Sequence, residues 1–464
     1  MATLIDPTAQ GFLLAESRSV PMHVGGLQLF RKPEGAGRDY VRELVHQLRD
    51  VEQMAPLFLR HPKRGPRTAG QLIWVEDDQF DIEHHVRHGA LPKPGRVREL
   101  LELVSRLHST RLDWDRPLWE ATVIEGLRDG RIALYTKLHH ALVDGVSASR
   151  LMSSVLSTDP DERNMPAPWA KRPSSGRAAK DRVELSEVPV GALRSALGIG
   201  AEAAGMPAAL IRTLNKTVRN ETSTLSVHAP RTMLNQPIAG ARRFAAQDWP
   251  VERLRAVGKA TGTTINDVVI AMVSGSLRRY LLTFDELPEQ SLIAMVPIGL
   301  NAKQSQVASA AGGNAVGSIM VKMGTEHADP AARLREVHRS MKAGKEALST
   351  MTPVQILAMS ALGQVPAVLT PVLKMHGIMR PAYNVIISNV PGPRTTQYLN
   401  GAQLLGVYPV SIPIHGVALN VTCQSYDGLM CFGLTGCRRT VPHLQVLLTY
   451  LDDELAALEK AAGL

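Results

Sequence analysis

The chain has 464 residues, of which 44% are hydrophobic and 4% aromatic, and its formal net charge is +9 at pH 7. This composition predicts two or three globular domains with mainly aliphatic cores. It lacks any uninterrupted run of about 18 apolar residues, which argues against a membrane-spanning helix, and the start, MATLIDPTAQ, lacks the basic region of a signal peptide. The positive charge favours phosphates or an acidic membrane surface. No nucleic-acid-binding motif is present, so we expect no nucleic acid partner.

Residues 1–160 predict a first mixed α/β domain. Apolar residues alternate as in strands, or recur at helical spacing, in separate segments. The expected strands are 24–30, 71–77 and 131–140, and the expected helices are 40–50 and 97–110.

A connecting region follows at 161–228. Residues 157–182 are rich in proline, serine, alanine and charge without an apolar period, which predicts a linker or exposed crossing loop. Residues 190–220 predict one or two helices that pack across the two halves or lie on a membrane surface. Residues 355–379 are apolar but interrupted by two prolines and a lysine, which indicates a buried or interfacial segment.

Residues 229–464 predict a second α/β domain. A strand at 241–250 leads into a helix closed by Gly262, and a second helix at 263–283 is capped by Thr264. The remaining expected strands are 292–300, 314–323, 383–393, 404–412, 418–426 and 429–437, and the remaining helices are 329–348 and 441–461. The cysteines Cys423, Cys431 and Cys437 fit no common zinc pattern, so we expect reduced core residues and, from them, a reducing compartment.

The stretch HHALVDG at 139–145 is the main candidate site. Side chains alternate along a strand, so His140 shares an apolar face with Leu138, whereas His139 points the opposite way. A histidine in an apolar cavity tends to stay neutral and can act as a general base. Asp144 is expected to hold local geometry, through a buried ion pair or by orienting an imidazole, and Gly145 to leave room for substrate.

Neither a metal site nor a second catalytic histidine pair is expected. A metal site is not expected, because adjacent histidines on a strand rarely share one ion and no HExxH or cysteine cluster accompanies them. The second pair, His84 and His85 in HHVRHG, lacks the downstream aspartate and glycine, so we expect a structural or surface role there.

Several separated motifs carry a family resemblance. HHALVDG resembles the signature of the CoA-dependent, chloramphenicol-acetyltransferase-like superfamily. From about residue 4 to 455 the chain resembles the bacterial wax ester synthase/diacylglycerol acyltransferase family. The motifs that carry this resemblance are PMHVGGLQLF (21–30), RPLWE (116–120), TINDVV (264–269), GGNAVGS (312–318), SNVPGP (388–393) and LNVTCQSYDGLMCFGL (419–434).

The resemblance implies an α/β fold of two chloramphenicol-acetyltransferase-like domains with mixed sheets, joined by a crossing linker, with an active-site tunnel between them. It implies transfer of a long-chain acyl group from acyl-CoA to a fatty alcohol or diacylglycerol. The products would be wax ester or triacylglycerol for neutral-lipid storage, formed without an acyl-enzyme. His140 would be the general base and His139 its support. Acyl-CoA would be a co-substrate, and no cofactor or metal is expected.

Further candidate residues follow from these motifs. Asn266 lies in the first turn of a helix, where free N–H groups and the dipole favour negative charge, so it either stabilises an oxyanion or caps the helix. Asp144 is expected to pair with a buried arginine. Pro117, Leu118 and Trp119 are expected to bind substrate at a channel wall, or else to pack in the core. Asp267, beside Asn266, is a further candidate, and Asn389 either borders the tunnel or has a purely architectural role. Arg242 and Arg243 are expected to contact the phosphates of CoA.

Two alternatives remain open at this stage. One is an acyltransferase of the same fold that uses another hydroxyl or an amine acceptor. The other is a lipid-binding protein without turnover. For the leading hypothesis we expect a cytoplasmic bacterial protein, peripherally bound to the inner membrane or to lipid inclusions. The sequence does not predict the oligomeric state.

Overall fold

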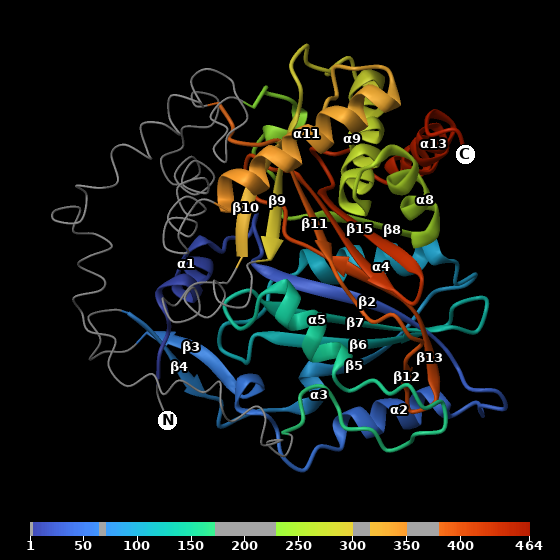
Figure 1. Cartoon of the computed structure of the whole chain (residues 1–464). Helices are drawn as coiled ribbons and strands as arrows, with labels where there is room; N and C mark the ends of the chain where they lie inside the picture. The colour runs from blue at the N-terminus through green and yellow to red at the C-terminus, as the bar shows by residue number, and fades with distance from the viewer. Residues whose placement is uncertain (1–2, 65–70, 172–228, 300–315, 350–379) are drawn as a thin grey trace.

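The computed structural model describes residues 3–64, 71–171, 229–299, 316–349 and 380–464 (Figure 1). Within these residues the strands form two six-stranded sheets and one three-stranded sheet. The segments 190–220 and 355–379, for which helical and interfacial structure was expected, lie outside the described residues. The mixed α/β fold with two sheet-rich halves is confirmed.

The N-terminal sheet has the strand order β12-β13-β2-β7-β6-β5. Its strands are β12 (Tyr398–Leu399), β13 (Ala402–Val410), β2 (His23–Arg31), β7 (Ile132–His139), β6 (Trp119–Glu125) and β5 (Val86–Ala90). The strand β13 comes from the C-terminal half and pairs antiparallel with β2. Residues 398–410, which we expected within the C-terminal domain, therefore belong to the N-terminal sheet.

The C-terminal sheet has the order β10-β9-β11-β14-β15-β8. Its strands are β10 (Val316–Lys322), β9 (Ile293–Gly299), β11 (Val385–Val390), β14 (Leu419–Tyr426), β15 (Leu429–Cys437) and β8 (Arg242–Pro250). The sheet is mixed, because β11 runs parallel to both β9 and β14 whereas the other pairs are antiparallel. The three cysteines are buried and free, as expected.

Four helices lie together beside the C-terminal sheet (Figure 1). They are α8 (Val251–Thr261), α9 (Ile265–Thr283), α11 (Pro330–Ser349) and α13 (Val446–Ala461). The helix α9 is central and buried along most of its length, which fits its nearly continuous apolar sequence. Gly262 ends α8 in the left-handed conformation at φ 67°, and Thr264 caps α9, so both sequence predictions are confirmed.

The N-terminal half carries α2 (Tyr40–Arg49), α3 (Ile82–His85), α4 (Val97–Ser109) and α5 (Gly145–Ser153), with short 3-10 turns at Pro56–Phe58 and, in the second half, Met233–Asn235. The helix α4 covers the free edge of β8. The backbone N–H of Phe244 donates to Ser105 Oγ at 2.9 Å, and that of Arg242 donates to Ser109 Oγ at 2.8 Å. These serines satisfy donors that an edge strand otherwise leaves open, and they join the two halves.

A small unit covers the end of β7. It consists of α1 (Pro7–Ala15) and the sheet β1-β4-β3, formed by β1 (Thr3–Leu4), β4 (Leu72–Glu76) and β3 (Arg60–Arg64). Leu13 of α1 and Trp74 of β4 share one apolar cluster with Ala141 and Leu142. The turn that follows the histidine pair is therefore packed rather than open on this side.

The beginning of the expected linker is exposed at residues 158–164 and then packs against the N-terminal half around Trp169. Trp169 is buried, donates from Nε1 to the carbonyl oxygen of Leu48 at 2.8 Å, and packs against Trp119 with ring centroids 5.0 Å apart. Met165 and Ala167 are buried as well. Residues 158–164 are exposed, as expected of a loop, whereas the apolar residues between the prolines that follow anchor the segment on the N-terminal half.

Candidate active site

The strand β7 ends inside the protein, and both of its faces are buried. On the face that carries His139, Lys137 is buried as well: it donates from Nζ to the carbonyl oxygen of Thr110 at 3.0 Å and lies 3.1 Å from Glu120 Oε2. His139 is the last residue of β7, and His140 is the first residue beyond it. The pair therefore lies where the backbone leaves the sheet.

His139 is completely buried. Its Nδ1 accepts a hydrogen bond from the backbone N–H of Ala141 at 3.0 Å, so the ring proton of the neutral imidazole is on Nε2. This Nε2 lies 3.7 Å from Glu16 Oε1, which is an electrostatic contact longer than a hydrogen bond. Burial, with smaller contributions from His140 and Arg111, lowers the pKa of His139 to about 3. His139 is therefore neutral and fixed in one tautomer.

His140 lies against an aromatic side chain. Its ring stacks on Phe12 of α1 with centroids 4.1 Å apart and planes inclined by 23°. Its Nδ1 is buried and has no hydrogen-bond partner among the described residues. Burial lowers the pKa of His140, and the negative charge of Asp144 opposes part of that shift. The imidazole is therefore neutral near pH 7 and has an unpaired ring nitrogen.

Asp144 caps the helix that follows the turn. Its Oδ1 accepts from the backbone N–H of Ser147 at 2.7 Å, and its Oδ2 accepts from the Ser147 hydroxyl at 3.1 Å. No ion pair between Asp144 and an arginine forms within the described residues, where the carboxylate caps α5 instead. Gly145 is the exposed first residue of α5, with open space where a Cβ would be.

The helix α5 reaches the C-terminal sheet. The Ser149 hydroxyl donates to Gln424 Oε1 of β14 at 3.1 Å. Figure 1 shows α5 between the strands of the N-terminal sheet and the end of the C-terminal sheet. The turn with the two histidines and Asp144 is therefore held near the junction of the two halves.

Two further buried histidines lie behind the pair. His23 of β2 is directly opposite His139 in the β2–β7 register, and its ring meets the edge of the His108 ring at a centroid distance of 4.6 Å. His108 accepts from the Tyr135 hydroxyl at Nδ1 (2.9 Å) and donates from Nε2 to the carbonyl oxygen of Ser411 (3.0 Å). Burial lowers the pKa of both, to about 3 for His108. They form neutral structural support under the site.

The PLW motif packs in the core. Pro117, Leu118 and Trp119 are buried, and the Leu118 carbonyl oxygen accepts from the N–H of His139 at 2.9 Å. Trp119 donates from Nε1 to the carbonyl oxygen of Phe58 at 3.0 Å and stacks on His85. Of the two roles left open, the structure favours core packing, so the assignment of these residues to substrate binding is not supported.

His84 and His85 have the structural and surface roles expected of them. His85 is buried between Phe80 and Trp119 and contacts the carbonyl oxygen of Trp119 from Nδ1 at 2.7 Å. His84 is half-buried near Arg87. Burial lowers the pKa of His85 to about 4.

The arginine prediction is wrong for Arg242. Its guanidinium is buried and donates to the carbonyl oxygens of Ala239 and Ser19, so a phosphate cannot reach it in this arrangement. Burial lowers its pKa to about 10. Arg243 is half-buried and lies 3.9 Å from Glu102 Oε1 of α4.

Asn266 and Asp267 lie in the first turn of α9, as predicted, but their side chains have different contacts. Asp267 is buried, closes a capping box with Thr264, and accepts from His338 Nδ1 of α11 at 2.9 Å. Both bonds are accepted by Oδ2, whereas Oδ1 is buried and has no hydrogen-bond partner among the described residues; the burial of the side chain argues against substrate binding. Asn266 is half-buried, and no hydrogen bond joins it to His140 in the described residues.

Asn389 is half-buried near the end of β11, opposite Cys423 of β14. The turn that follows is tightly packed. Gly392 donates its N–H to Ser425 Oγ at 3.0 Å, and a Cβ at this position would lie 2.1 Å from the Ser425 carbonyl oxygen. The SNVPGP motif therefore needs its glycine for close backbone approach, which supports an architectural role for this motif.

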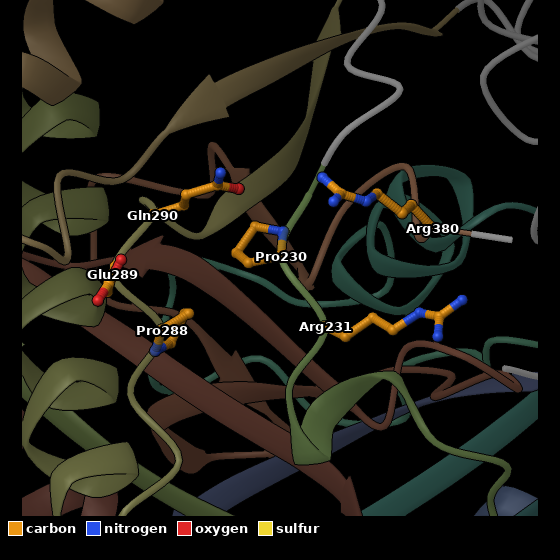
Figure 2. A pocket seen from close by; sticks show the side chains of 6 residues that line it. All are labelled: Pro230, Arg231, Pro288, Glu289, Gln290 and Arg380. Carbon is orange, nitrogen blue, oxygen red and sulfur yellow. The ribbon is translucent and has the colours of Figure 1, made fainter. Parts of the chain in front are cut away.

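A cavity of about 530 Å³ opens elsewhere, on the C-terminal half (Figure 2). It is lined by Pro230, Arg231, Pro288, Glu289, Gln290 and Arg380. No residue of HHALVDG lines it, so it is not the site defined by the histidine pair. In the part of the chain that the structure describes, no group of three or more histidine, cysteine or acidic side chains is arranged to hold a metal ion, and no helix is long and apolar enough to cross a membrane.

Solved structures with the same two-sheet fold include condensation domains and an acyltransferase. The first condensation domain of the CDA synthetase superposes with a TM-score of 0.57 over 100% of this chain and 97% of that domain, at 14% identity, which establishes a shared fold. The wax ester synthase/diacylglycerol acyltransferase from Marinobacter aquaeolei superposes with a TM-score of 0.78 at 42% identity and full coverage of both chains.

Sequence comparisons give the family. The wax ester synthase/diacylglycerol acyltransferase catalytic domain matches residues 5–269, and the C-terminal domain of the same family matches residues 312–459. The chain is 43% identical to a Mycobacterium bovis protein named as a diacylglycerol O-acyltransferase, over 99% of this chain and 100% of that one. A Mycobacterium tuberculosis protein so named is 45% identical, with 98% coverage of each. The chain belongs to the wax ester synthase/diacylglycerol acyltransferase family and is an acyltransferase.

One side chain at the site was missed by the sequence reasoning. Glu16, at the end of α1, places a completely buried carboxylate beside His139. The sequence around Glu16 gives little indication of a role at the site, because a single acidic residue after an apolar run is common at the end of a helix. Only the tertiary contact with the histidine pair distinguishes it.

Proposed function

We propose that this acyltransferase moves a long-chain fatty acyl group from acyl-CoA to the hydroxyl of a fatty alcohol or a diacylglycerol. The product is a wax ester or a triacylglycerol, and free CoA is released. Family membership and the similarity to acyltransferases along the whole chain support the reaction type. The observation that carries the mechanism is the half-buried, neutral imidazole of His140 at the junction of the two halves, whose buried Nδ1 has no hydrogen-bond partner among the described residues.

His140 acts as the general base. A hydroxyl is a poor nucleophile until a base accepts its proton, and a neutral imidazole can do so near pH 7. The hydroxyl oxygen attacks the thioester carbonyl carbon as its proton passes to His140, which gives a tetrahedral intermediate. The carbon–sulfur bond then breaks, and the CoA sulfur leaves and takes up the proton. No acyl-enzyme forms.

The oxyanion of the tetrahedral intermediate needs a hydrogen-bond donor. Asn266 is the candidate, because it lies in the first turn of α9 and its side chain forms no hydrogen bond to another described residue. Asn266→Ala is expected to lower kcat by about 10²-fold if the amide contacts the oxyanion. An unchanged kcat would remove Asn266 from the mechanism.

The direct test of the function uses purified protein with palmitoyl-CoA and either hexadecanol or dipalmitoylglycerol. CoA release and ester formation are both measured, for the wild type, His140→Ala and the control His46→Ala, which removes an exposed histidine of α2. We expect ester from at least one acceptor and its loss in His140→Ala alone. Lipid binding without ester would favour a non-catalytic protein, and turnover only with an amine or another hydroxyl would favour the alternative acceptor class.

The transfer needs no cofactor besides acyl-CoA as co-substrate. The chemical reason is that a thioester is already activated toward an oxygen nucleophile, so base catalysis and oxyanion stabilisation are sufficient. Activity is expected to survive dialysis against EDTA. Loss of activity that a divalent metal restores would contradict this proposal.

We further propose that the protein works in the bacterial cytoplasm, bound peripherally to the inner membrane or to lipid inclusions, where its acceptors are. The net charge of +9 suits an anionic surface. Leu4 of β1 and Leu14 of α1 are each 66% exposed, on the same unit that supplies Phe12 to His140. Fractionation of cells that accumulate neutral lipid should find the protein with membranes or inclusions, and recovery in the soluble fraction alone would contradict this location.

A further inference from the structure

The carboxylate of Glu16 is completely buried and is faced by hydrogen-bond donors on both oxygens. Oε1 accepts from the backbone N–H of Met22 at 3.1 Å and lies 3.7 Å from His139 Nε2. Oε2 accepts from Trp114 Nε1 at 2.7 Å and lies 3.3 Å from the Arg111 guanidinium. A buried carboxylate is costly unless it is paired, and here four groups from separate segments converge on one side chain.

Two of these contacts lead to the backbone on either side of His140. The first runs through His139, whose Nε2–H faces Glu16 so that Nδ1 can accept from the N–H of Ala141. The second runs through Met22, whose N–H donates to Glu16 while its carbonyl oxygen accepts from the N–H of His140 at 2.8 Å. The residues before and after His140 are thus tied to one carboxylate.

The same helix end reaches the ring of His140. Glu16 follows α1 directly, and Phe12 of α1 stacks on the imidazole at a centroid distance of 4.1 Å. The position of α1 therefore fixes the His140 backbone through Glu16 and its ring plane through Phe12. A shift of the carboxylate would be transmitted to both.

We propose that Glu16 is a positioning residue for catalysis, which holds His139 in its Nε2–H tautomer and, through Met22, orients His140 toward the reacting hydroxyl. This inference rests on the proposed role of His140 as the base. It assigns His139 a defined part, as the link between a buried carboxylate and the turn. Glu16 itself does not contact substrate.

The substitution Glu16→Gln isolates the effect of the carboxylate at nearly constant volume. All four neighbours are donors, and a glutamine amide offers one acceptor oxygen and one NH₂ group. Whichever way the amide turns, NH₂ faces a donor. If it faces His139, the imidazole must move its proton to Nδ1, where it would confront the N–H of Ala141. A displacement of His140 of about 1 Å is enough to reduce the rate by about 10²-fold.

The experiment compares the wild type with Glu16→Gln, Trp114→Phe and Glu454→Gln, using palmitoyl-CoA and the acceptor that the wild type prefers. Trp114→Phe removes one donor but leaves the carboxylate. Glu454→Gln is the matched control, because Glu454 is also a mostly buried carboxylate paired with an arginine, Arg333, but lies on α13. For each variant kcat, the KM of both substrates and the midpoint of thermal unfolding are measured.

We expect kcat to fall by about 10²-fold in Glu16→Gln and by about tenfold or less in Trp114→Phe, with KM values within about threefold of the wild type. Glu454→Gln should lower the unfolding temperature at least as much and retain kcat. The inference is overturned if Glu16→Gln keeps wild-type kcat, or if Glu454→Gln loses as much kcat at an equal loss of stability. An active His140→Ala variant would overturn the proposed role of His140 as the base. If His140→Ala is inactive and Glu16→Gln is fully active, the base assignment stands and only the positioning role of Glu16 is overturned.

Discussion

Phe12 stacks on the imidazole of His140, with the two ring centroids 4.1 Å apart. This contact contributes to the burial that lowers the pKa of His140. The neutral base therefore persists to lower pH than an exposed histidine would allow. The helix α1 and the histidine motif, more than 100 residues apart in sequence, meet at one site.

Replacing Phe12 by leucine should expose the imidazole and raise the pKa of His140 toward its usual value near 6.5. Since the base must be neutral, the acidic limb of the kcat/KM profile should move to higher pH. The profile is measured between about pH 5 and pH 9, because kcat/KM reports groups of the free enzyme. A limb that stays in place would mean that the ring does not control protonation of the base.

Asp144 should have the opposite effect on the same limb. Its negative charge raises the pKa of His140, so Asp144→Asn should lower that pKa and move the limb to lower pH. Asparagine caps helices about as well as aspartate, so stability should change little, whereas Asp144→Ala should cost about 1 kcal/mol. A severe loss of stability in Asp144→Asn would indicate a partner other than the Ser147 cap, such as the arginine that the sequence led us to expect.

Local sequence signals predicted the elements that depend on local chemistry. The capping of α9 by Thr264, the end of α8 at Gly262 and the position of the histidine pair at the end of a strand all follow from residue type and spacing. They are correct because the deciding interactions lie within a few residues of one another. The helix-capping role of Asp144 has such a local signal too, but we assigned the charge a distant partner.

Predictions failed where the deciding partner is distant in sequence. The strand β13 has the apolar alternation of any strand, and nothing in it indicates pairing with β2. Arg242 looks like a surface residue, but its carbonyl partners include Ser19, some 220 residues away. Trp169 lies in a proline-rich stretch that reads as a linker, and its hydrogen bond to Leu48 becomes visible only in the fold.

The serines of α4 should be important for stability because they satisfy the edge of β8. Ser105→Ala leaves the buried N–H of Phe244 without its acceptor, which should cost about 1–3 kcal/mol in the free energy of unfolding. Ser109→Ala should act similarly on the N–H of Arg242. Thr283→Val is the control, since Thr283 bonds the carbonyl four residues earlier on an exposed helix face. Denaturant unfolding measures the free energy of unfolding of the three variants. An equal loss of stability in all three would contradict the role of Ser105 and Ser109 at the edge of β8.

Gly392 should tolerate no side chain. In Gly392→Ala the Cβ would lie 2.1 Å from the Ser425 carbonyl oxygen, so the turn after β11 must move away from β14. We expect a loss of several kcal/mol in the free energy of unfolding, because backbone rather than a flexible side chain blocks the space. Gly37→Ala is the control, as nothing lies within 4 Å of its Cβ position. A stability of Gly392→Ala equal to that of the control would contradict the packing described here.

The buried histidines should make the fold sensitive to acid. His108 and His139 each have a folded-state pKa of about 3 because burial disfavours the charged form. In the unfolded chain each titrates near 6.5, so the unfolded state binds more protons between the two values and stability rises with pH over that range. The stabilisation is complete above about pH 6.5 and is lost as the pH falls below it. Between about pH 6.5 and pH 5 the loss should be about 2 kcal/mol for each histidine.

Denaturant unfolding at several pH values tests this, and His108→Gln separates the contribution of one ring. Protonation of His108 would place a second proton on Nδ1, which accepts from the Tyr135 hydroxyl, while Nε2 already donates to Ser411. Glutamine cannot titrate, so the variant should have a pH dependence smaller by about 2 kcal/mol over the same interval, whatever its stability at neutral pH. An unchanged pH dependence would mean that the neutral state of His108 does not contribute to the acid sensitivity of the fold.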